Sequence, residues 1–128
     1  MTDISNYLLP EILMEEDETV SSTTAALYLE KIGIDLPSGK WRIHWSIMIA
    51  VSDIACAAWI GVEKDYGGPA QKSLDLHGEY QEVGFWKTAS GECIEVFDNP
   101  ARLSLRFSRY FSGTVQVRDA VLIARRVE

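Results

Sequence analysis

Residues 41–51 alternate between apolar and mostly polar or small side chains, and this pattern limits the fold more than any other feature. The segment reads Trp-Arg-Ile-His-Trp-Ser-Ile-Met-Ile-Ala-Val, with a large apolar residue at every odd position. Successive side chains of a strand point to opposite faces, so this period of two predicts a strand with one wholly apolar face. Such a face needs a large apolar partner, which favours a sheet packed on a second sheet.

Turn signals divide the rest of the chain into further strands. The strand-like segments are 23–29, 57–63, 73–76, 80–88, 93–97, 103–108 and 115–123, with turns at 36–39, 90–91 and 98–100 and a loop at 64–69. The break in alternation at Asp119-Ala120 predicts a bulge. We expect an all-β fold, an antiparallel β-sandwich of about seven or eight strands. The wall opposite residues 41–51 is expected from segments 103–107, 115–117 and 121–123.

The first 20 residues predict an arm that precedes the sandwich domain of residues 21–128. Pro10 is suited to the first turn of a short helix, but so short a free segment is only marginally helical, so the arm is expected to be extended or a short helix. Its apolar side chains need a surface to pack on. We therefore take five residues of the arm as candidate interaction residues: Tyr7, Leu8, Leu9, Ile12 and Leu13.

The net charge of −7 is concentrated in this N-terminal part. Residues 1–30 hold seven acids and no Lys or Arg, while the remainder holds twelve of each sign. A neutral body makes nucleic acid an unexpected partner. The acidic leader and the six arginines between Arg102 and Arg126 predict complementary surfaces, within one chain or between neighbours.

No segment predicts export or membrane insertion. The N-terminus lacks a basic start and a continuous apolar run, and no apolar stretch approaches the ~20 residues that span a bilayer. Cys56 and Cys93 lie far apart without metal-ligand spacing, so we expect reduced thiols, with a bridge between them as the alternative. We expect a protein made in a cytoplasm, without a membrane partner.

Residue types that carry catalysis are not arranged in recognisable motifs. His44 and His77 have no partner spacing typical of a zinc site or a catalytic dyad. A carboxylate pair of the glycosidase type could come from Asp65, Glu79, Glu82 and Glu95, but the sequence does not give their separation. We therefore expect no catalytic residue, no metal and no cofactor, and we rank a small enzyme of the cupin or glycosidase type last.

Three aromatic residues have two interpretations. Trp59, Tyr66 and Trp86 could form a binding surface for a sugar or a receptor, next to the glycine-rich loop at Gly67-Gly68. The alternative, which we favour for the two tryptophans, is that they cap the core of the sandwich. A carbohydrate-binding or receptor-binding module is therefore the second functional hypothesis.

Residues 22–127 resemble bacteriophage virion structural proteins with a jelly-roll or related β-sandwich domain. The resemblance rests on strand order and aromatic placement in segments 39–46, 83–87 and 113–122. It implies a jelly-roll-like fold and a non-enzymatic role as a capsid decoration or cement protein, or as a head-fibre, neck or tail component. It also implies self-association, often as trimers, beside a major capsid protein or another virion protein. The leading hypothesis is a virion protein, made in the host cytoplasm, whose arm reaches over a neighbour.

Overall fold

The structure, a computed structural model, describes residues 11–24, 28–52, 56–80, 83–111 and 113–127. These residues form nine strands and no helix. The strands are β1 (Ile12–Asp17), β2 (Ser21–Thr23), β3 (Leu29–Leu36), β4 (Gly39–Val51), β5 (Cys56–Lys64), β6 (Lys72–Tyr80), β7 (Lys87–Phe97), β8 (Ala101–Phe111) and β9 (Val115–Arg126). The all-β expectation is confirmed.

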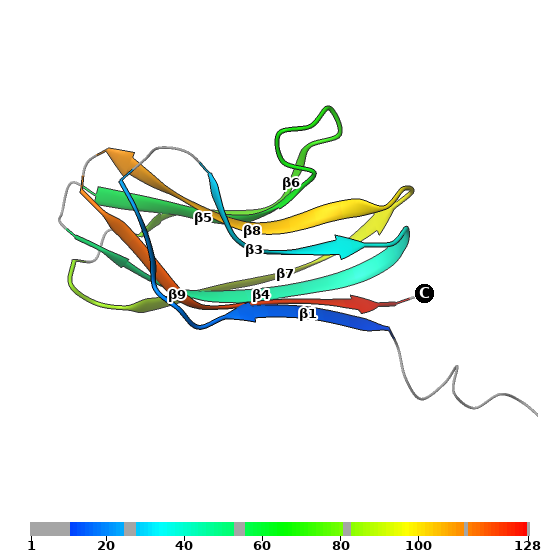
Figure 1. Cartoon of the computed structure of the whole chain (residues 1–128), viewed down its shortest axis with the longest axis horizontal. Coiled ribbons are helices and arrows are strands. Elements are labelled where there is room, and N and C mark those ends of the chain that lie inside the picture. Colours follow the sequence, from blue (N-terminus) through cyan, green and yellow to red (C-terminus); the bar gives the residue numbers. More distant parts are fainter. Residues whose placement is uncertain (1–10, 25–27, 53–55, 81–82, 112, 128) are drawn as a thin grey trace, which may run out of the picture.

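The strands lie in two antiparallel sheets that pack face to face, as Figure 1 shows. Sheet A has the order β1-β9-β4-β7, with β2 also paired to β9, and sheet B has the order β3-β8-β5-β6. Every pairing between named strands is antiparallel. The fold is therefore the expected jelly-roll-like β-sandwich.

Strand β4 supplies the centre of the core, as its period of two predicts. Its odd positions from Trp41 to Val51 are between 0% and 3% exposed, while Arg42 and His44 on the other face are exposed. Both buried indoles are hydrogen-bonded: Nε1 of Trp41 donates to the carbonyl of Pro37 (3.1 Å) and Nε1 of Trp45 to Oδ2 of Asp75 (2.8 Å). The tryptophans therefore bury their large apolar area without leaving a donor unpaired.

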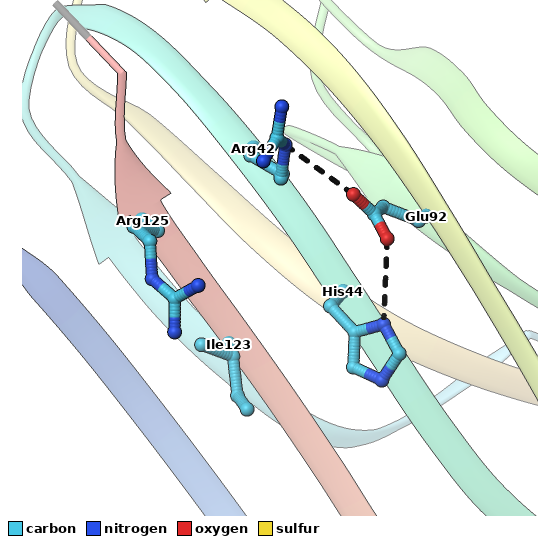
Figure 2. A pocket seen from close by; sticks show the side chains of 5 residues that line it. All are labelled: Arg42, His44, Glu92, Ile123 and Arg125. Carbon is cyan, nitrogen blue, oxygen red and sulfur yellow. Dashed lines mark ion pairs between the residues drawn. The ribbon is translucent and has the colours of Figure 1, made fainter.

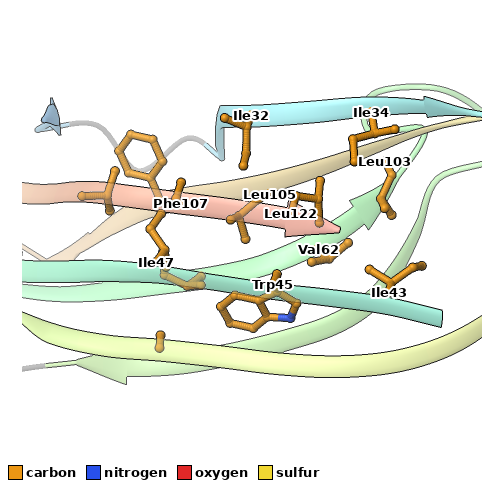
Figure 3. Close-up of a cluster of buried hydrophobic side chains, with 14 of the residues drawn as sticks. Ile32, Ile34, Ile43, Trp45, Ile47, Val62, Leu103, Leu105, Phe107 and Leu122 are labelled. Atoms are coloured by element: carbon orange, nitrogen blue, oxygen red, sulfur yellow. The ribbon is translucent and has the colours of Figure 1, made fainter. Parts of the chain in front are cut away.

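The opposite wall of the core comes from sheet B, which corrects part of the expectation. Segment 103–107 lies in β8 and faces β4 across the interior, as predicted (Figure 3). Segments 115–117 and 121–123, however, lie in β9, which is hydrogen-bonded to β4 in sheet A. Their buried side chains extend the wall that β4 begins. The period of two identifies a buried face but does not say which sheet a strand joins.

Part of the expected arm is a strand of the sandwich. Residues Ile12–Asp17 form β1 and pair with β9 over their whole length, so sheet A begins before the expected boundary at residue 20, and residues 12–17 are not helical. Lys31 of β3 binds this segment through an ion pair and a hydrogen bond. Its side chain is 1% exposed, and Nζ lies 3.0 Å from Oδ2 of Asp17 and donates to Oγ of Ser21 at 2.7 Å. Residues 1–10 lie outside the described residues.

The predicted bulge at the start of the last apolar run is confirmed. The register between β4 and β9 shifts between Ser46 and Met48, opposite Val121 and Arg118. Asp119 lies in the shift with a φ of 52°, a left-handed conformation that aspartate tolerates better than most residues. The bulge moves Val121 and Ile123 to the outer face of sheet A and keeps Leu122 in the core.

Two turn and strand expectations were wrong. Ser90-Gly91 is not a turn, because β7 continues through it. Gly91 lies opposite Trp45 in the register, and a Cβ atom there would come 2.6 Å from Nε1 of the indole and still closer to Oδ2 of Asp75, so the glycine makes room for this hydrogen-bonded pair. The strand expected at 80–88 is not continuous, since 83–86 form an isolated bridge and a turn and 81–82 lie outside the described residues.

Candidate functional site

The three aromatic residues considered for one binding surface are divided between the two sheets, with Trp59 and Tyr66 on the side of sheet B and Trp86 beside sheet A. Trp59 alternates with the core residues of β5, so it points to the outer face of sheet B. Tyr66 lies in the loop after β5, where the guanidinium of Arg106 is 3.9 Å from its ring centre. Trp86 precedes β7 of sheet A. The structure therefore does not bring the three into one surface.

Trp86 lines a hollow of about 400 Å³ near one end of sheet A. The guanidinium of Arg118 lies 4.2 Å from the centre of its indole and holds the ring in place. The other residues of the hollow are small or polar: Ala50, Val51, Ser52, Gly84, Thr114 and Gln116. An aromatic ring beside hydroxyl and amide groups is suited to a small polar organic ligand.

A second hollow, of about 310 Å³, lies on the outer face of sheet A (Figure 2). Nε of Arg42 lies 3.3 Å from Oε1 of Glu92, whose other oxygen is 4.0 Å from Nδ1 of His44. Arg125 and Ile123 of β9 complete the lining. The three charged or titratable side chains with printed contacts are each about half exposed, so these pairs add little to stability.

Exposed aliphatic side chains surround this second hollow. Ile12 and Met14 of β1 are 48% and 54% exposed, and Ile94 and Val96 of β7 are 48% and 60% exposed. Their positions follow from the register, because residues directly opposite in an antiparallel pair share a face. Sequence reasoning missed this surface. The available signal was that apolar residues occur at both odd and even positions of β1 and β7. A strand with one buried face needs apolar residues at only one of these two sets of positions.

The candidate residues of the arm divide between the core and this surface. Leu13 packs against the hydrophobic core, and Ile12 points to the outer face of sheet A. Tyr7, Leu8 and Leu9 lie outside the described residues. One part of the expected charge complementarity lies within the chain, because Glu11 of the acidic leader pairs with a C-terminal arginine. Nε of Arg126 lies 2.8 Å from Oε2 of Glu11.

The outer face of sheet B carries a closed polar network around Glu30. Nε and Nη2 of Arg102 donate to the two oxygens of Glu30 at 3.2 and 2.9 Å, and Oγ of Ser104 donates at 2.6 Å. Burial raises the pKa of Glu30, but these hydrogen bonds and the charges of Arg102 and Arg106 outweigh it and hold the pKa below its ordinary value. The network therefore stabilises the ionised carboxylate.

The carboxylates considered for a glycosidase pair have other partners: Asp65 accepts from the backbone N–H of Arg102 at 2.8 Å, and Glu95 pairs with Lys72 at 3.3 Å. The side chains of Glu79 and Glu82 lie outside what the structure describes. Within its described ranges, no group of three or more His, Cys, Asp or Glu side chains is placed to hold a metal ion.

The two cysteines are free thiols, as expected. Cys56 is fully buried, and its Sγ lies 3.5 Å from the carbonyl of Thr114. Burial raises the pKa of Cys93 to about 11, with a further contribution from Asp75 and its neighbouring carboxylates. A thiol with such a pKa is protonated at neutral pH and is a poor nucleophile. In the part of the chain that the structure describes, no helix is long and apolar enough to span a membrane.

Comparison with known proteins gives structural likeness without sequence likeness. No protein-family model and no curated protein matches the sequence. The T13 particle of infectious bursal disease virus matches over 91% of this chain and 31% of its own, with a TM-score of 0.65 and 8% identity. Eiger TNF from S. frugiperda matches over 91% of this chain and 93% of its own, with a TM-score of 0.62 and 4% identity.

A sugar-binding protein is also similar in fold. The C-terminal domain of EclA matches over 82% of this chain and 77% of its own, with a TM-score of 0.51 and 14% identity. The present chain spans only about a third of the viral chains that it matches. Identities this low show the fold alone. The chain is therefore a β-sandwich module of a kind found in viral particles, in a tumour-necrosis-factor protein and in a sugar-binding domain.

Proposed function

We propose that this chain is a non-enzymatic structural protein of a virion that self-associates and packs on neighbouring virion proteins. The observation that carries the proposal is the outer face of sheet A, where aliphatic side chains about half exposed to solvent surround half-exposed charges. Large apolar side chains left exposed on one face of a soluble protein commonly mark protein contacts. The likeness to a viral particle protein over 91% of this chain supports the viral setting.

Within this proposal we favour a decoration or cement protein of a bacteriophage capsid, with a head-fibre, neck or tail component as the alternative. Its site is the virion, after synthesis in the host cytoplasm. The viral structures compared above come from infectious bursal disease virus, so they support a viral particle protein and not the choice of a bacteriophage. The docking role of the arm is assigned to residues before Glu11 and to Ile12, because Leu13 packs against the core.

Two measurements test this proposal. Mass spectrometry of particles purified from the source of the gene is expected to find the chain at a fixed copy number, and its absence from particles would overturn the virion assignment. Sedimentation equilibrium of the full chain is expected to show self-association, with a trimer as the expected state. Deletion of residues 1–10 is expected to leave the β-sandwich folded and to reduce the copy number on particles.

The hollow at Trp86 favours a second candidate function, the binding of a sugar. Its indole and its polar neighbours Ser52, Thr114 and Gln116 offer a stacking surface and hydrogen-bonding groups. A glycan array with the full chain tests this candidate. Binding is expected to be lost in Trp86→Ala and kept in Tyr66→Ala, which alters an aromatic residue on the other sheet. An array without binding removes the candidate.

A further inference from the structure

Two arginines stand directly opposite each other on the outer face of sheet A. The register pairs Arg42 of β4 with Arg125 of β9, so their side chains leave the sheet about 5 Å apart. Both side chains are exposed, and both line the hollow of about 310 Å³ that Figure 2 shows. Like charges that face each other across two strands destabilise a sheet. A negative group bound between the two guanidinium groups would remove this repulsion.

One acid stands beside the two arginines, and it is already paired. Oε1 of Glu92 lies 3.3 Å from Nε of Arg42, and its Oε2 lies 4.0 Å from Nδ1 of His44. Within the described ranges of the chain, Arg125 has no ion pair. The two guanidinium groups therefore exceed the one carboxylate of the hollow by one positive charge.

The acids of β1 do not balance this charge. Glu11 pairs with the neighbouring Arg126, whose Nε lies 2.8 Å from its Oε2. Glu16 is opposite Val121, four residues along β9 from Arg125, which corresponds to roughly 13 Å of strand. At physiological ionic strength, exposed charges so far apart are largely screened from each other. The positive excess is therefore local to the hollow, although the whole chain has a net charge of −7.

The shape and charge of the hollow determine the class of ligand. Its volume of about 310 Å³ lies at the small end of the range for ligand pockets. A guanidinium can donate two parallel hydrogen bonds to a carboxylate, and one excess positive charge matches a monoanion. Glu92 would repel the second charge of a phosphate. Ile123 and the imidazole of His44 offer contacts to the carbon atoms of the ligand.

We propose that the hollow between Arg42 and Arg125 binds the carboxylate of a small organic acid. Arg125 is the main donor, because it has no acidic partner in the part of the chain that the structure describes, and Arg42 is shared with Glu92. Because both arginines are exposed, the affinity is expected to be in the millimolar range. This site goes beyond the proposed function, since a small ligand in the hollow does not depend on a contact with another protein.

An NMR titration of the isotopically labelled full chain tests this binding. The probe is glucuronate, which carries a carboxylate on a compact hydroxylated ring. Glucose has the same ring without the charge, and glucose-6-phosphate carries a phosphate instead. Each point is compared with sodium chloride of the same ionic strength, because salt alone shifts amide signals near charges. Glucuronate is expected to shift the backbone amide signals of Arg42, His44, Ile123 and Arg125 to saturation, and glucose is expected to leave them in place.

Three substitutions distinguish this site from a general effect of charge. Arg125→Gln removes the guanidinium and is expected to weaken glucuronate binding about 10-fold. Glu92→Gln removes the adjacent negative charge and is expected to strengthen binding about 3-fold. Lys72→Gln, on the edge strand β6 of sheet B, lowers the net charge as Arg125→Gln does and is expected to leave binding unchanged. Circular dichroism checks that each variant is folded.

The outcomes either support the site or overturn it. Saturable glucuronate binding that Arg125→Gln weakens and Lys72→Gln does not weaken supports the proposal. Shifts equal to those of sodium chloride, or binding indifferent to Arg125→Gln, overturn it, and tighter binding of glucose-6-phosphate overturns the assignment of a carboxylate. If no probe binds but Arg125→Gln lowers the copy number on particles, the arginine serves a contact between proteins. The site is then wrong and the proposed function remains.

Discussion

The outer faces of the two sheets both carry polar groups but use them differently. On sheet B, Glu30 accepts hydrogen bonds from Arg102 and Ser104, and Ser73 donates to both oxygens of Glu63, which is 3% exposed. On sheet A, the corresponding ion pair of Arg42 and Glu92 is about half exposed and stands among uncovered aliphatic side chains.

The difference separates stability from association. Polar groups that are buried and fully hydrogen-bonded contribute to folding, because their loss leaves a desolvated partner unpaired. Exposed pairs contribute almost nothing to folding and remain available to another molecule. The polar groups on the outer face of sheet B therefore stabilise the fold, whereas those on the outer face of sheet A remain available to bind a partner.

The largest expected effect comes from removing the carboxylate at the centre of the sheet B network. Glu30→Ala leaves the buried hydroxyl of Ser104 without its acceptor and leaves the partly exposed guanidinium of Arg102 with Asp35 as its carboxylate partner, and is expected to cost about 2 to 3 kcal/mol of unfolding free energy. Glu92→Ala removes the equivalent acid from sheet A and is expected to cost less than about 0.5 kcal/mol. Urea unfolding measures the free-energy change of both variants. Equal changes would show that the two outer faces do not differ in their contribution to stability.

A serine pair gives a smaller version of the same comparison. Ser73→Ala removes the hydroxyl that lies 3.0 and 2.9 Å from the two oxygens of the buried Glu63, and is expected to destabilise the chain by about 2 kcal/mol. Ser90→Ala on the exposed outer face of sheet A is the matched control, with an expected change within about 0.5 kcal/mol. If Ser73→Ala does not change the unfolding free energy, the carboxylate of Glu63 has another hydrogen-bond donor.

Acid should weaken the attachment of β1. Hydrogen bonds from the side chain and backbone of Thr19, together with Lys31, lower the pKa of Asp17 to about 2 from 3.8. A lowered folded-state pKa contributes stability that is present above the unfolded pKa of 3.8 and is lost as the pH falls through about 2. Urea unfolding between about pH 5 and pH 2 measures the loss. Asp17→Asn is expected to flatten this pH dependence, and Asp98→Asn is expected to leave it unchanged.

The most local effect is on a single thiol at the edge of sheet A. With its pKa raised from 9.0 to about 11, Cys93 is expected to react with iodoacetamide at pH 8 about 100-fold more slowly than in the unfolded chain. Peptide mass spectrometry of native and urea-treated protein follows the modification. Equal rates in the two states would mean that the raised pKa does not govern this thiol.

The sequence predicts the parts of the fold in which side-chain period and burial agree. Every odd position of β4 from Trp41 to Val51 is buried, and the bulge at Asp119 lies where alternation breaks. Sheet membership was not predictable, because β8 and β9 carry the same alternation and pair in different sheets. Gly91 resembles a turn residue, but its lack of a side chain accommodates Trp45 from the neighbouring strand, which is a tertiary requirement.

Strand β3 and the exposed face of sheet A illustrate what local patterns omit. Strand β3 was not predicted, although Ile32, Ile34 and Leu36 alternate with the period of two that a strand requires. The position of β1 also depends on tertiary pairing. In the sequence, Ile12 and Met14 fit a free arm, and only their register with β9 places them on the outer face of sheet A. The hollow at Arg42 takes its residues from β4, β7 and β9, and the hollow at Trp86 takes them from β4, β9 and the segments between strands, so neither has a signal along the chain.

Strand β9 also sets the order in which the two sheets can form. It is the last of the nine strands to emerge from the ribosome, yet it lies between β1 and β4 in the middle of sheet A. Pairing over such long sequence separations is slow, and sheet A stays incomplete until residues near Arg126 have left the exit tunnel. Sheet B needs no strand beyond β8 and can form earlier. Nascent chains translated side by side therefore present no finished outer face of sheet A to one another.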